Sequence, residues 1–537
     1  MSFKRFFKLF IYILTMITTI IYIVYRIFFT IPTKLGFVSI FFALLVLFVE
    51  IWEAFDFFIY FINILMVKPK EYKTSNIIDE YPDIDIFIAT LNEPEGILCR
   101  TIEACLNLNY PDKNKLHIYL CDDGNRLNIK NLAKNYNINY ISRLTNRNFK
   151  AGNYNNALNK TSSPYIATFD ADMAPTPNFL EVTLPHFKDA NKIGFVQLPQ
   201  NFINPDIYQY RFGVENYIPF EQDYFYHSLQ ISKNATNSAV YCGTNTLFAR
   251  QALKDVGGFA TGTLSEDIAT GMLIESKGYT CIALNDISAY GKSVNDFDGF
   301  IKQRSRWAKG CVQMLKKYNI LNLKGLSIRQ KLEYLSCVSY WFFGFRRMVY
   351  LLAPLLFSIF GIIIIDCNLP VFLSIWIPTY LLKRYVLDKL EDNKRSSTWS
   401  KIYETVLAPV LCIDVLKEFF GLNPINFEVS PKSNSNGKTS KKNKKLFATH
   451  FILLLLNVIG FIMCFTSVYD SRIYNYALSF VWTISNIYYL LFAVIFDSRT
   501  KAYEYNFTPN KVNKYSKKAI FVALFNRRSN KKCKNWF

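Results

Sequence analysis

Two sets of acidic residues follow runs of apolar residues that are typical of strands. Asp122 and Asp123 come after the sequence HIYLC and precede a glycine, whereas Asp170 and Asp172 form an Asp-Ala-Asp after YIATF. A single acid in such a place commonly stabilises a turn or caps a helix. Two sets after strands of one sheet indicate more, because an open α/β sheet places its ligand chemistry at the carboxyl ends of its strands.

The Asp-x-Asp pattern suits a divalent cation beside a phosphorylated ligand. Hard cations take oxygen ligands and bridge diphosphates, so one carboxylate of Asp170 and Asp172 can contact a sugar nucleotide and the other a divalent metal. The chain has eleven cysteines without a CxxC pair and only four histidines. Neither a zinc site nor a disulfide framework is therefore expected.

Two further motifs lie in predicted helices. Ser265-Glu266-Asp267 opens one of them, and a serine followed by acids is what a helix start requires. Near a diphosphate, Asp267 could equally act as a general base on a sugar hydroxyl. The segment Gln303 to Trp307, QRSRW, would by itself be an amphipathic surface helix. Together with the acids, it offers an indole face for a sugar ring and Arg306 to neutralise a diphosphate.

The elements that must position these residues lie between about residues 68 and 335. Short apolar segments alternate there with helical patterns, such as those over 95–108 and 151–160, and no stretch is long enough to span a membrane. This alternation predicts an α/β domain with a mostly parallel sheet covered by helices. The predicted strands cover residues 84–89, 116–121, 138–142, 165–169 and 194–198.

Long apolar segments on both sides of this domain predict six membrane spans. A helix of about 20 apolar residues crosses the hydrocarbon core, and the first segment is too long for a signal-peptide core. The predicted spans are 6–31, 35–67, 347–365, 369–385, 447–469 and 474–496. An amphipathic stretch covers 399–422. The resulting divisions are 1–67, 68–335, 336–422, 423–445, 446–496 and a basic tail over 497–537.

The second predicted span contains Glu50, Glu53 and Asp56 at i, i+3, i+6 spacing. Three carboxylates on one helix face cannot all contact lipid, because a charge in mid-bilayer costs about 2.5 to 3.5 kcal/mol. The face marks either the exit of the helix into the headgroups or a polar path between helices. Both interpretations remain open at the level of sequence.

The distribution of charge predicts an orientation in the cell membrane. The 62 Lys and Arg outnumber the 41 Asp and Glu, which gives a net charge of +21. Basic residues flank the first span and gather in the 432–445 loop and the tail, whereas the loops at 32–35, 366–368 and 470–473 hold only Lys34 and Arg472. By the positive-inside rule, both termini and the α/β domain face the cytoplasm. The same distribution accounts for the charge without a nucleic-acid partner. With 51% hydrophobic and 17% aromatic residues, the chain is neither a disordered acidic protein nor an ordinary soluble enzyme.

Several blocks, in order along the chain, resemble the processive family 2 glycosyltransferases, the group of cellulose and hyaluronan synthases. Five are Thr90-Leu91-Asn92-Glu93-Pro94, Asp122-Asp123-Gly124, Asp170-Ala171-Asp172, Ser265-Glu266-Asp267 and Gln303 to Trp307. Lys150 begins a KAGN block, and Tyr241-Cys242-Gly243-Thr244 resembles the family's acceptor-side FFCGS. VQLPQ over 196–200 and Asn204-Pro205-Asp206 resemble the QTPH…NPD stretch of cellulose synthases.

A later block resembles the FxVTxK gating loop of cellulose synthases. It is FEVSPK over 427–432, and its matching residues are Phe427, Val429, Ser430 and Lys432. As an alternative, a linker of this composition needs no function. Leu91 stands where the family usually has an aromatic residue, and Ser265 and Ser430 replace threonines. About forty residues follow the last predicted span, so we expect no C-terminal PilZ domain and no activation by cyclic di-GMP through one.

The resemblance implies inverting transfer from a UDP-sugar, UDP-glucose first, to a growing β-linked glucan that then crosses the membrane. It implies Asp267 as the base and Asp170 and Asp172 at the Mg²⁺ or Mn²⁺. The other implied catalytic-domain residues bind donor or acceptor: Thr90, Glu93, Asp122 and Asp123 at the nucleoside end, Lys150 and Arg306 at the diphosphate, and Cys242, Glu266, Gln303 and Trp307 further along the site.

Rival functions use the same motifs. A hyaluronan or N-acetylglucosamine polymer synthase, and a β-1,3 or branched glucan synthase, differ only in donor or linkage. A non-processive lipid-phosphate sugar transferase would use the same Asp-x-Asp sheet without QxxRW and gating-loop blocks. A transporter or scaffold with a decayed enzyme domain would not need Asp170, Asp172 and Asp267, all of which are present. Sugar, linkage, metal, oligomeric state and accessory subunits are not fixed by the sequence.

Overall fold

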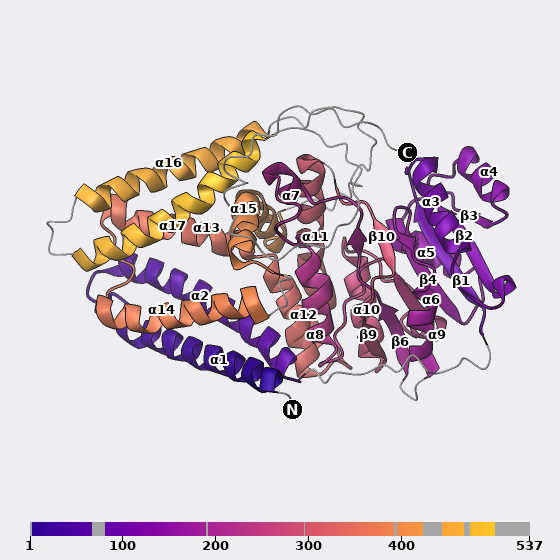
Figure 1. Cartoon of the computed structure of the whole chain (residues 1–537), viewed down its shortest axis with the longest axis horizontal. Helices are drawn as coiled ribbons and strands as arrows, with labels where there is room; N and C mark the ends of the chain where they lie inside the picture. The colour runs from indigo at the N-terminus through magenta and orange to yellow at the C-terminus, as the bar shows by residue number, and fades with distance from the viewer. Residues whose placement is uncertain are drawn as a thin grey trace.

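The structure is a computed structural model, and it describes residues 3–66, 81–188, 192–294, 296–390, 395–422, 443–466 and 473–499. The predicted gating block at 427–432 and nearly all of the predicted basic tail lie outside these ranges. A sheet with its helices forms one end of the molecule and long helices form the other, as Figure 1 shows.

The main sheet has seven strands in the order β3-β2-β1-β4-β8-β6-β9. Neighbouring strands are parallel except at β8, which runs antiparallel to both β4 and β6. The predicted mostly parallel sheet is therefore confirmed, with β8 and β9 as strands that the sequence pattern did not predict. The strands are β1 Ile84–Thr90, β2 Leu116–Asp122, β3 Asn139–Ser142, β4 Tyr165–Asp170, β6 Ile193–Gln197, β8 Thr246–Ala249 and β9 Thr280–Ala283.

A second, three-stranded sheet lies beside the first. It has the order β5-β10-β7 and consists of β5 Ala174–Pro175, β10 Ala289–Gly291 and β7 Asn201–Phe202. Tyr290 pairs with Ala174 and with Asn201. This small sheet joins the segment after Asp172 to the segment before helix α11, Phe297–Tyr318.

Helices cover both faces of the main sheet, and strand β1 is correspondingly apolar apart from Asp85 and Thr90. All seven of its residues are buried. Ile84, Ile86 and Ile88 pack with α3 Glu95–Leu106 and α4 Leu127–Asn135 on one face, whereas Phe87 and Ala89 pack with α5 Phe149–Leu158 on the other. A strand covered on both faces reads as a continuous apolar run rather than as an alternating one.

The helices of the α/β domain are mostly short and those of the bundle are long. In the domain they are α3 Glu95–Leu106, α4 Leu127–Asn135, α5 Phe149–Leu158, α6 Phe179–Thr183, α7 Ile207–Phe212, α8 Gln230–Lys233, α9 Arg250–Asp255, α10 Glu266–Ser276, α11 Phe297–Tyr318 and α12 Ile328–Tyr340. The others are α1 Phe3–Phe29, α2 Phe37–Met66, α13 Phe343–Phe360, α14 Leu369–Tyr385, α15 Ser397–Phe419, α16 Lys444–Thr466 and α17 Ile473–Ser498.

Five helices are long and apolar enough to cross a membrane within the described residues: α1, α2, α13, α16 and α17. They coincide with five of the six predicted spans. The fourth predicted span, over 369–385, is not confirmed: α14 has those bounds, and its 17 residues reach roughly 26 Å against a core of about 30 Å. The chain then continues as a π-helical turn over Val386–Leu390, which carries Asp388 and Lys389. The chain is a multi-pass membrane protein by these helices.

The three carboxylates of α2 face other helices. Glu50 accepts hydrogen bonds from Arg26 Nε at 2.8 Å and Tyr22 Oη at 2.9 Å, both on α1. Asp56 pairs with Arg346 of α13 at 2.7 Å. Glu53, one turn from each, is electrostatically coupled to Arg346 and Tyr350 of α13 and has an exposed side chain. This face of α2 is therefore turned toward polar groups of the bundle.

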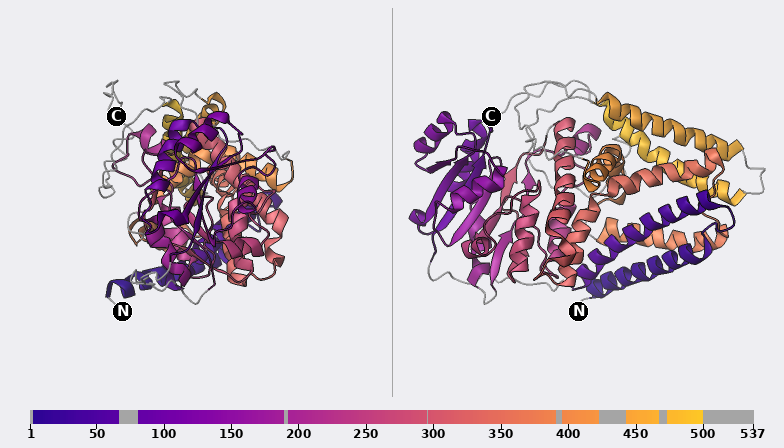
Figure 2. Two further views of the ribbon diagram at one scale, coloured as in Figure 1. Left: turned by 90° about the vertical axis from the view of Figure 1, so that its right-hand side faces the viewer. Right: turned by 180° about the vertical axis from the view of Figure 1, so that it is seen from behind.

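Helix α15 joins the bundle to helix α11, which carries the QRSRW motif. Ser305 Oγ donates to Asp414 Oδ2 at 2.5 Å, and Gln313 Nε2 donates to Glu418 Oε1 at 3.2 Å. Figure 2 shows α15 between α11 and the long helices in the view from behind. The position of QRSRW is thus fixed against the membrane helices as well as against the sheet.

Candidate active site

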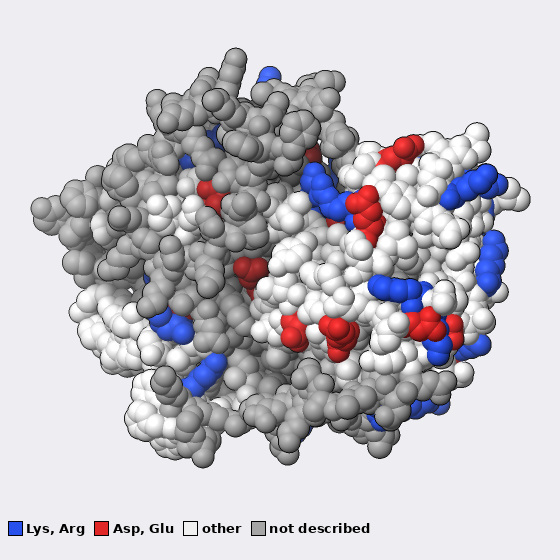
Figure 3. Space-filling view, turned by 45° about the vertical axis from the view of Figure 1, so that its right-hand side comes forward, with Lys and Arg blue, Asp and Glu red and all other residues white. Residues whose placement is uncertain are grey.

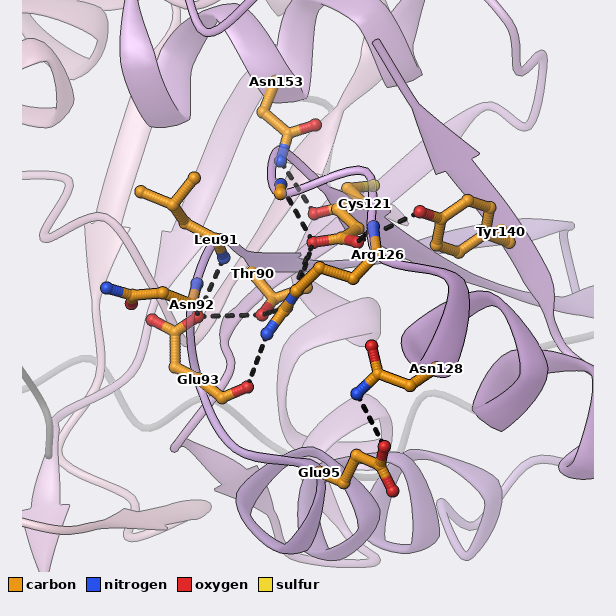
Figure 4. A network of polar contacts seen from close by, with 12 residues as sticks. Thr90, Leu91, Asn92, Glu93, Glu95, Cys121, Arg126, Asn128, Tyr140 and Asn153 are labelled. Carbon is orange, nitrogen blue, oxygen red and sulfur yellow. Dashed lines mark hydrogen bonds and ion pairs between the residues drawn. The ribbon is translucent and has the colours of Figure 1, made fainter. Parts of the chain in front are cut away.

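The ends of β1 and β2 carry a connected polar network, shown in Figure 4. Glu93 Oε2 accepts hydrogen bonds from Thr90 Oγ1 and from the Leu91 amide, both at 2.8 Å. Arg126 reaches across from the start of α4 and donates to Thr90 Oγ1 and to the Glu93 carbonyl, both at 2.7 Å. Thr90 and Glu93 therefore contact each other and share an arginine that the motifs did not reveal, whereas their contact with a substrate stays a prediction.

Asp122 lies at the centre of this network and is fully buried. Its carboxylate accepts from the amides of Gly124 at 3.0 Å and Arg126 at 2.7 Å, from the Arg126 guanidinium and from Tyr140 Oη at 3.0 Å. These contacts fit the alternative in which an acid after a strand stabilises the turn. Contact between Asp122 and a nucleotide stays a prediction.

Asp123, the next residue, is held by a different arginine. Arg143 donates to both of its oxygens, from Nε at 2.5 Å and from Nη2 at 2.7 Å. Burial raises the pKa of Asp123, and the Arg143 guanidinium opposes that shift. The two aspartates of one motif thus form two separate arginine contacts, which face the same strand end.

Lys150, Asp170 and Gly243 meet at the end of β4. Lys150 Nζ donates to Asp170 Oδ1 at 2.5 Å and to the Gly243 carbonyl at 2.6 Å. The Asp170 amide donates to Thr244 Oγ1 at 2.9 Å. Three blocks distant in the sequence, KAGN, Asp-Ala-Asp and YCGT, are therefore in direct contact.

Asp267 approaches the same point from the start of α10. A Cβ placed on Gly243 would lie 3.1 Å from Asp267 Oδ2 and 3.3 Å from Lys150 Nζ, and Gly243 has φ of +82°. Residues other than glycine rarely adopt that backbone conformation. Gly243 therefore leaves room for a carboxylate and an ammonium to lie on either side of one small space.

Burial perturbs both acids at the start of α10. It raises the pKa of Glu266 to about 7, with the Asp267 carboxylate adding to the shift. Burial also raises the pKa of Asp267, while Lys150 and Arg306 lower it. Two carboxyl groups with raised pKa values beside two cations are typical of a site that transfers protons and binds anions.

Helices α10 and α11 pack closely where the two motifs meet. A Cβ on Gly310 would lie 2.2 Å from Ser265 Oγ. The Ser265 hydroxyl makes no capping hydrogen bond, so α10 begins where predicted but without the predicted serine cap, and that hydroxyl instead donates to the Trp307 carbonyl at 3.5 Å. The Trp307 ring lies 6.3 Å from the ring of Trp341, edge to face.

Cys242 lies beside this junction and is positioned by glutamines. The Cys242 amide donates to Gln197 Oε1 at 2.8 Å, and Gln230 Nε2 approaches Cys242 Sγ at 3.1 Å. Burial raises the pKa of the Cys242 thiol, so it is not a thiolate at neutral pH. Gln197 belongs to the VQLPQ block, whose resemblance had suggested no role for it.

The described residues contain no group of three or more His, Cys, Asp or Glu that could hold a metal ion. Asp170 is the last residue of β4, and Asp172 lies two residues later in the turn that follows the strand. That set is compatible with a hard cation that takes its remaining ligands from phosphate oxygens and water.

On the face drawn in Figure 3, basic and acidic side chains are interspersed over the described surface of the domain.

Two further predicted residues have less definite surroundings. The charge of Arg306 lowers the pKa values of Glu266 and Asp267. The Arg306 Nε atom is buried without a hydrogen-bond partner among the described residues. Gln303 lies half-buried in α11. Phe427, Val429, Ser430 and Lys432 lie outside the described residues, so the predicted gating contact has no structural counterpart to report.

Comparison with known proteins identifies the domain that carries this site. The family model described as glycosyl transferase family 2 matches residues 85–257. The chain is a member of glycosyl transferase family 2. The match includes the Asp122, Lys150, Asp170 and Gly243 contacts, and it ends before Asp267.

The glycosyltransferase is also related to cellulose synthase catalytic subunits over most of its length. It is 33% identical over 382 residues to the UDP-forming cellulose synthase catalytic subunit of Pseudomonas fluorescens, which covers 71% of this chain and 51% of that protein. It is 29% identical over 431 residues to the cellulose synthase 1 catalytic subunit of Komagataeibacter xylinus, covering 79% and 57%. The chain thus spans about half the length of the curated relatives that it matches.

Among solved structures, a mannosyltransferase from Pyrobaculum calidifontis in complex with GDP-mannose and Mn²⁺ aligns with a TM-score of 0.45 and 16% identity. The alignment covers 71% of this glycosyltransferase and 99% of that chain. Neither the donor nor the metal of this chain follows from a similarity at that level.

Proposed function

We propose that the chain is a processive, inverting glycosyltransferase that polymerises sugar from UDP-glucose into a β-linked glucan and passes the polymer across the membrane. The observation that carries the proposal is the convergence of Asp267 and Lys150 on Gly243, beside Asp170. A base and a cation on either side of one small space are what a single displacement at an anomeric carbon requires.

Asp267 is the base in this proposal. It takes the proton from the acceptor hydroxyl, which attacks the anomeric carbon as the bond to the UDP oxygen breaks on the opposite face. The Asp267 carboxylate is buried, and its raised pKa brings its proton affinity closer to the operating pH. Lys150 and Arg306 stabilise the negative charge that the diphosphate gains on leaving.

The network around Thr90, Glu93 and Arg126 is proposed to bind the nucleoside end. Its members lie at the carboxyl ends of β1 and β2, the edge where open α/β sheets bind ligands. Asp123 and Arg143 form the second part of this subsite.

Asp170 and Asp172 are proposed to hold Mg²⁺ or Mn²⁺ together with the diphosphate. Two carboxylates fit a hard cation of this kind, which uses one or two protein carboxylates and substrate phosphates rather than a cage of protein ligands. When bound, the ion would neutralise diphosphate charge. Lys150, which contacts Asp170 directly, would neutralise part of the same diphosphate charge.

The inward face of α2 is proposed to line the path of the polymer. A glycan is too polar to cross lipid unaided. Glu50, Glu53 and Asp56 provide a polar stripe among α1, α2 and α13, and Glu53 remains exposed there. The catalytic domain would then face the cytoplasm, where UDP-sugars are made, in agreement with the distribution of basic residues.

Labelled UDP-sugars added one at a time to purified membranes test the proposal. We expect UDP-glucose to give a long product that linkage-specific β-1,4-glucanase degrades, and membranes carrying Asp267→Asn to give none. Incorporation from UDP-N-acetylglucosamine alone would indicate the alternative polymer. A product of one sugar on a lipid, or no sugar transfer from any donor, would contradict processive synthesis.

A further inference from the structure

One arginine of the QRSRW motif, Arg304, has no role in the proposed chemistry. Its side chain is 4% exposed. The guanidinium carbon lies 4.4 Å from the centroid of the Trp307 ring and 4.6 Å from that of Phe300. A guanidinium within about 6 Å of an indole is attracted by the ring, and its planar shape allows it to stack. Arg304 therefore holds one face of Trp307.

Glu221 fixes the Arg304 guanidinium in turn. Arg304 Nη2 forms a buried ion pair with Glu221 Oε2. Arg304 Nε is buried and has no hydrogen-bond partner in the part of the chain that the structure describes. The orientation of the guanidinium thus depends on Glu221 and on the two rings.

Asp206 of the Asn-Pro-Asp stretch holds the loop that supplies Glu221. The Glu221 amide donates to Asp206 Oδ2 at 2.8 Å, and the amides of Tyr208 and Gln209 donate to Oδ1, each at 2.8 Å. Asp206 caps α7 with one oxygen and holds Glu221 with the other. The Tyr208 ring, at the start of α7, stacks on Tyr403 of α15 at 4.0 Å.

We propose that Arg304, fixed by Glu221 and Asp206, is a positioning residue that orients the Trp307 indole for the acceptor sugar. The inference rests on the proposed function, because it takes the acceptor to be a sugar chain at Trp307. A misplaced indole displaces the attacking hydroxyl from the anomeric carbon, and small displacements reduce such reactions strongly. The binding of UDP-sugar, at the other end of the site, does not depend on this contact.

Arg304→Lys tests the contact because it keeps the charge opposite Glu221 and removes the planar group that stacks on Trp307. Arg211→Lys is the matched control. Arg211 is also buried, and its guanidinium carbon lies 4.8 Å from the ring of Phe297, the first residue of α11, and 4.5 Å from the Phe496 ring, with no contact to Trp307 among those that the structure describes. Both substitutions remove a buried stacked guanidinium, so they cause similar packing defects.

The first measurement is elongation of a gluco-oligosaccharide acceptor. We expect Arg304→Lys to lower kcat/KM for the acceptor by about tenfold or more, with kcat itself reduced, and to leave the KM for UDP-glucose within about twofold, as for loss of orientation at the reacting hydroxyl. Arg211→Lys should change none of these constants. A rise in the KM for UDP-glucose equal to the loss in acceptor kcat/KM, or an unchanged acceptor kcat/KM, would overturn the inference.

A double-mutant cycle with Trp307→Phe shows whether Arg304 acts through Trp307. If it does, Arg304→Lys reduces elongation by no more than about twofold in the Trp307→Phe background, because the two changes remove one interaction. Multiplicative losses would contradict the inference. Glu221→Gln, which leaves Arg304 in place, should reduce elongation less than Arg304→Lys and should likewise add little in the Trp307→Phe background. Glu221→Gln takes the place of Arg304→Lys in the cycle if the Arg304→Lys protein does not accumulate.

Tryptophan emission separates failure of the inference from failure of the proposed function. The emission spectrum of a protein minus that of the same protein carrying Trp307→Phe isolates the signal of Trp307. We expect this difference spectrum to be shifted in Arg304→Lys relative to wild type, and to be unchanged in Arg211→Lys. An unchanged difference spectrum overturns the positioning role without any need for turnover. A wild-type protein that transfers no sugar contradicts the proposed function, and with it the acceptor part of the inference, whatever the spectra show.

Discussion

The Lys150 ammonium lies 2.5 Å from the Asp170 carboxylate and also donates to the Gly243 carbonyl. Residues from α5, from the end of β4 and from the YCGT block therefore share one cation. Because hydrogen bonds to a charged group contribute about 1.5 to 3 kcal/mol, we expect Lys150→Met to raise the KM for UDP-sugar by about 10- to 100-fold. Initial rates of UDP release over a range of donor concentrations measure this.

Lys160→Met provides the control for Lys150→Met. Lys160 follows the same helix, is exposed and contacts only the Ser142 carbonyl, at 3.4 Å, among the contacts of its side chain that the structure describes. Its removal should leave the KM unchanged. Equal effects of the two substitutions would show that Lys150 acts through net charge rather than through its place at Asp170.

Arg143→Met should weaken nucleotide binding and destabilise the domain. It leaves the buried Asp123 carboxylate without its bidentate partner, and Arg143 is the group that lowers the pKa of Asp123. Loss of a partner by a buried polar group costs about 1 to 3 kcal/mol. Binding of UDP measured by calorimetry should fall, whereas an affinity equal to that of the wild type would remove Asp123 from the nucleoside subsite.

The rate should fall on the acid side of neutrality. A base accepts a proton only when it is ionised, and a raised carboxyl pKa extends the protonated form to higher pH. Burial raises the pKa of Glu266 to about 7 and also raises that of Asp267. We therefore expect kcat/KM to increase with pH through an acid limb near pH 7, with the two groups titrating as a pair.

Glu266→Gln separates the two acids. With Glu266 removed, Asp267 is the remaining carboxyl group at the start of α10, and the acid limb should move to lower pH. The pH profile of UDP release from both proteins measures the shift. A limb at the same pH in wild type and Glu266→Gln would assign the titration to another group.

The ion pair between Arg250 and Asp85 should be a main source of stability for the sheet. It is buried, and Arg250 also donates to the carbonyls of Leu158 at 2.9 Å and Thr161 at 3.0 Å. Removal of one partner from a buried pair costs about 3 to 5 kcal/mol. Arg250→Met should therefore lower the Tm clearly, whereas Lys254→Met, at an exposed position of the same helix α9, should leave it unchanged.

The sequence predicted those parts of the fold that depend on local patterns. Strands β1, β2, β4 and β6 were predicted because mostly apolar runs mark strands covered on both faces, and β3 was predicted from a shorter apolar segment although it is a largely unburied edge strand. Strands β8 and β9 were missed, and β8 is the strand that runs antiparallel between β4 and β6. The span predicted over 369–385 has the same bounds as α14, but α14 is not among the five described helices that are long and apolar enough to cross a membrane.

The site was predicted where residue types and spacing indicate chemistry, and missed where strand register creates the contact. Asp123 and Arg143 are twenty residues apart, and they meet because β2 pairs with β3 so that Asp122 is opposite Ser142. Gly243 meets Lys150 because β8 lies beside β4, with Thr246 opposite Thr168. Isolated arginines such as Arg126 and Arg143 carry no spacing signal of their own. Arg304 and Glu221 likewise meet only in the folded chain.

The transfer of labelled glucose from UDP-glucose by Asp267→Asn, compared with wild type and with Asp286→Asn at an exposed position, tests the central assignment most directly. We expect Asp267→Asn to insert into membranes and to bind UDP-glucose, and its transfer to fall by about 10²- to 10⁴-fold, the usual contribution of a general base. Asp286→Asn should transfer glucose as the wild type does. Polymer formation by Asp267→Asn at the wild-type rate would contradict the assignment of Asp267 as the base.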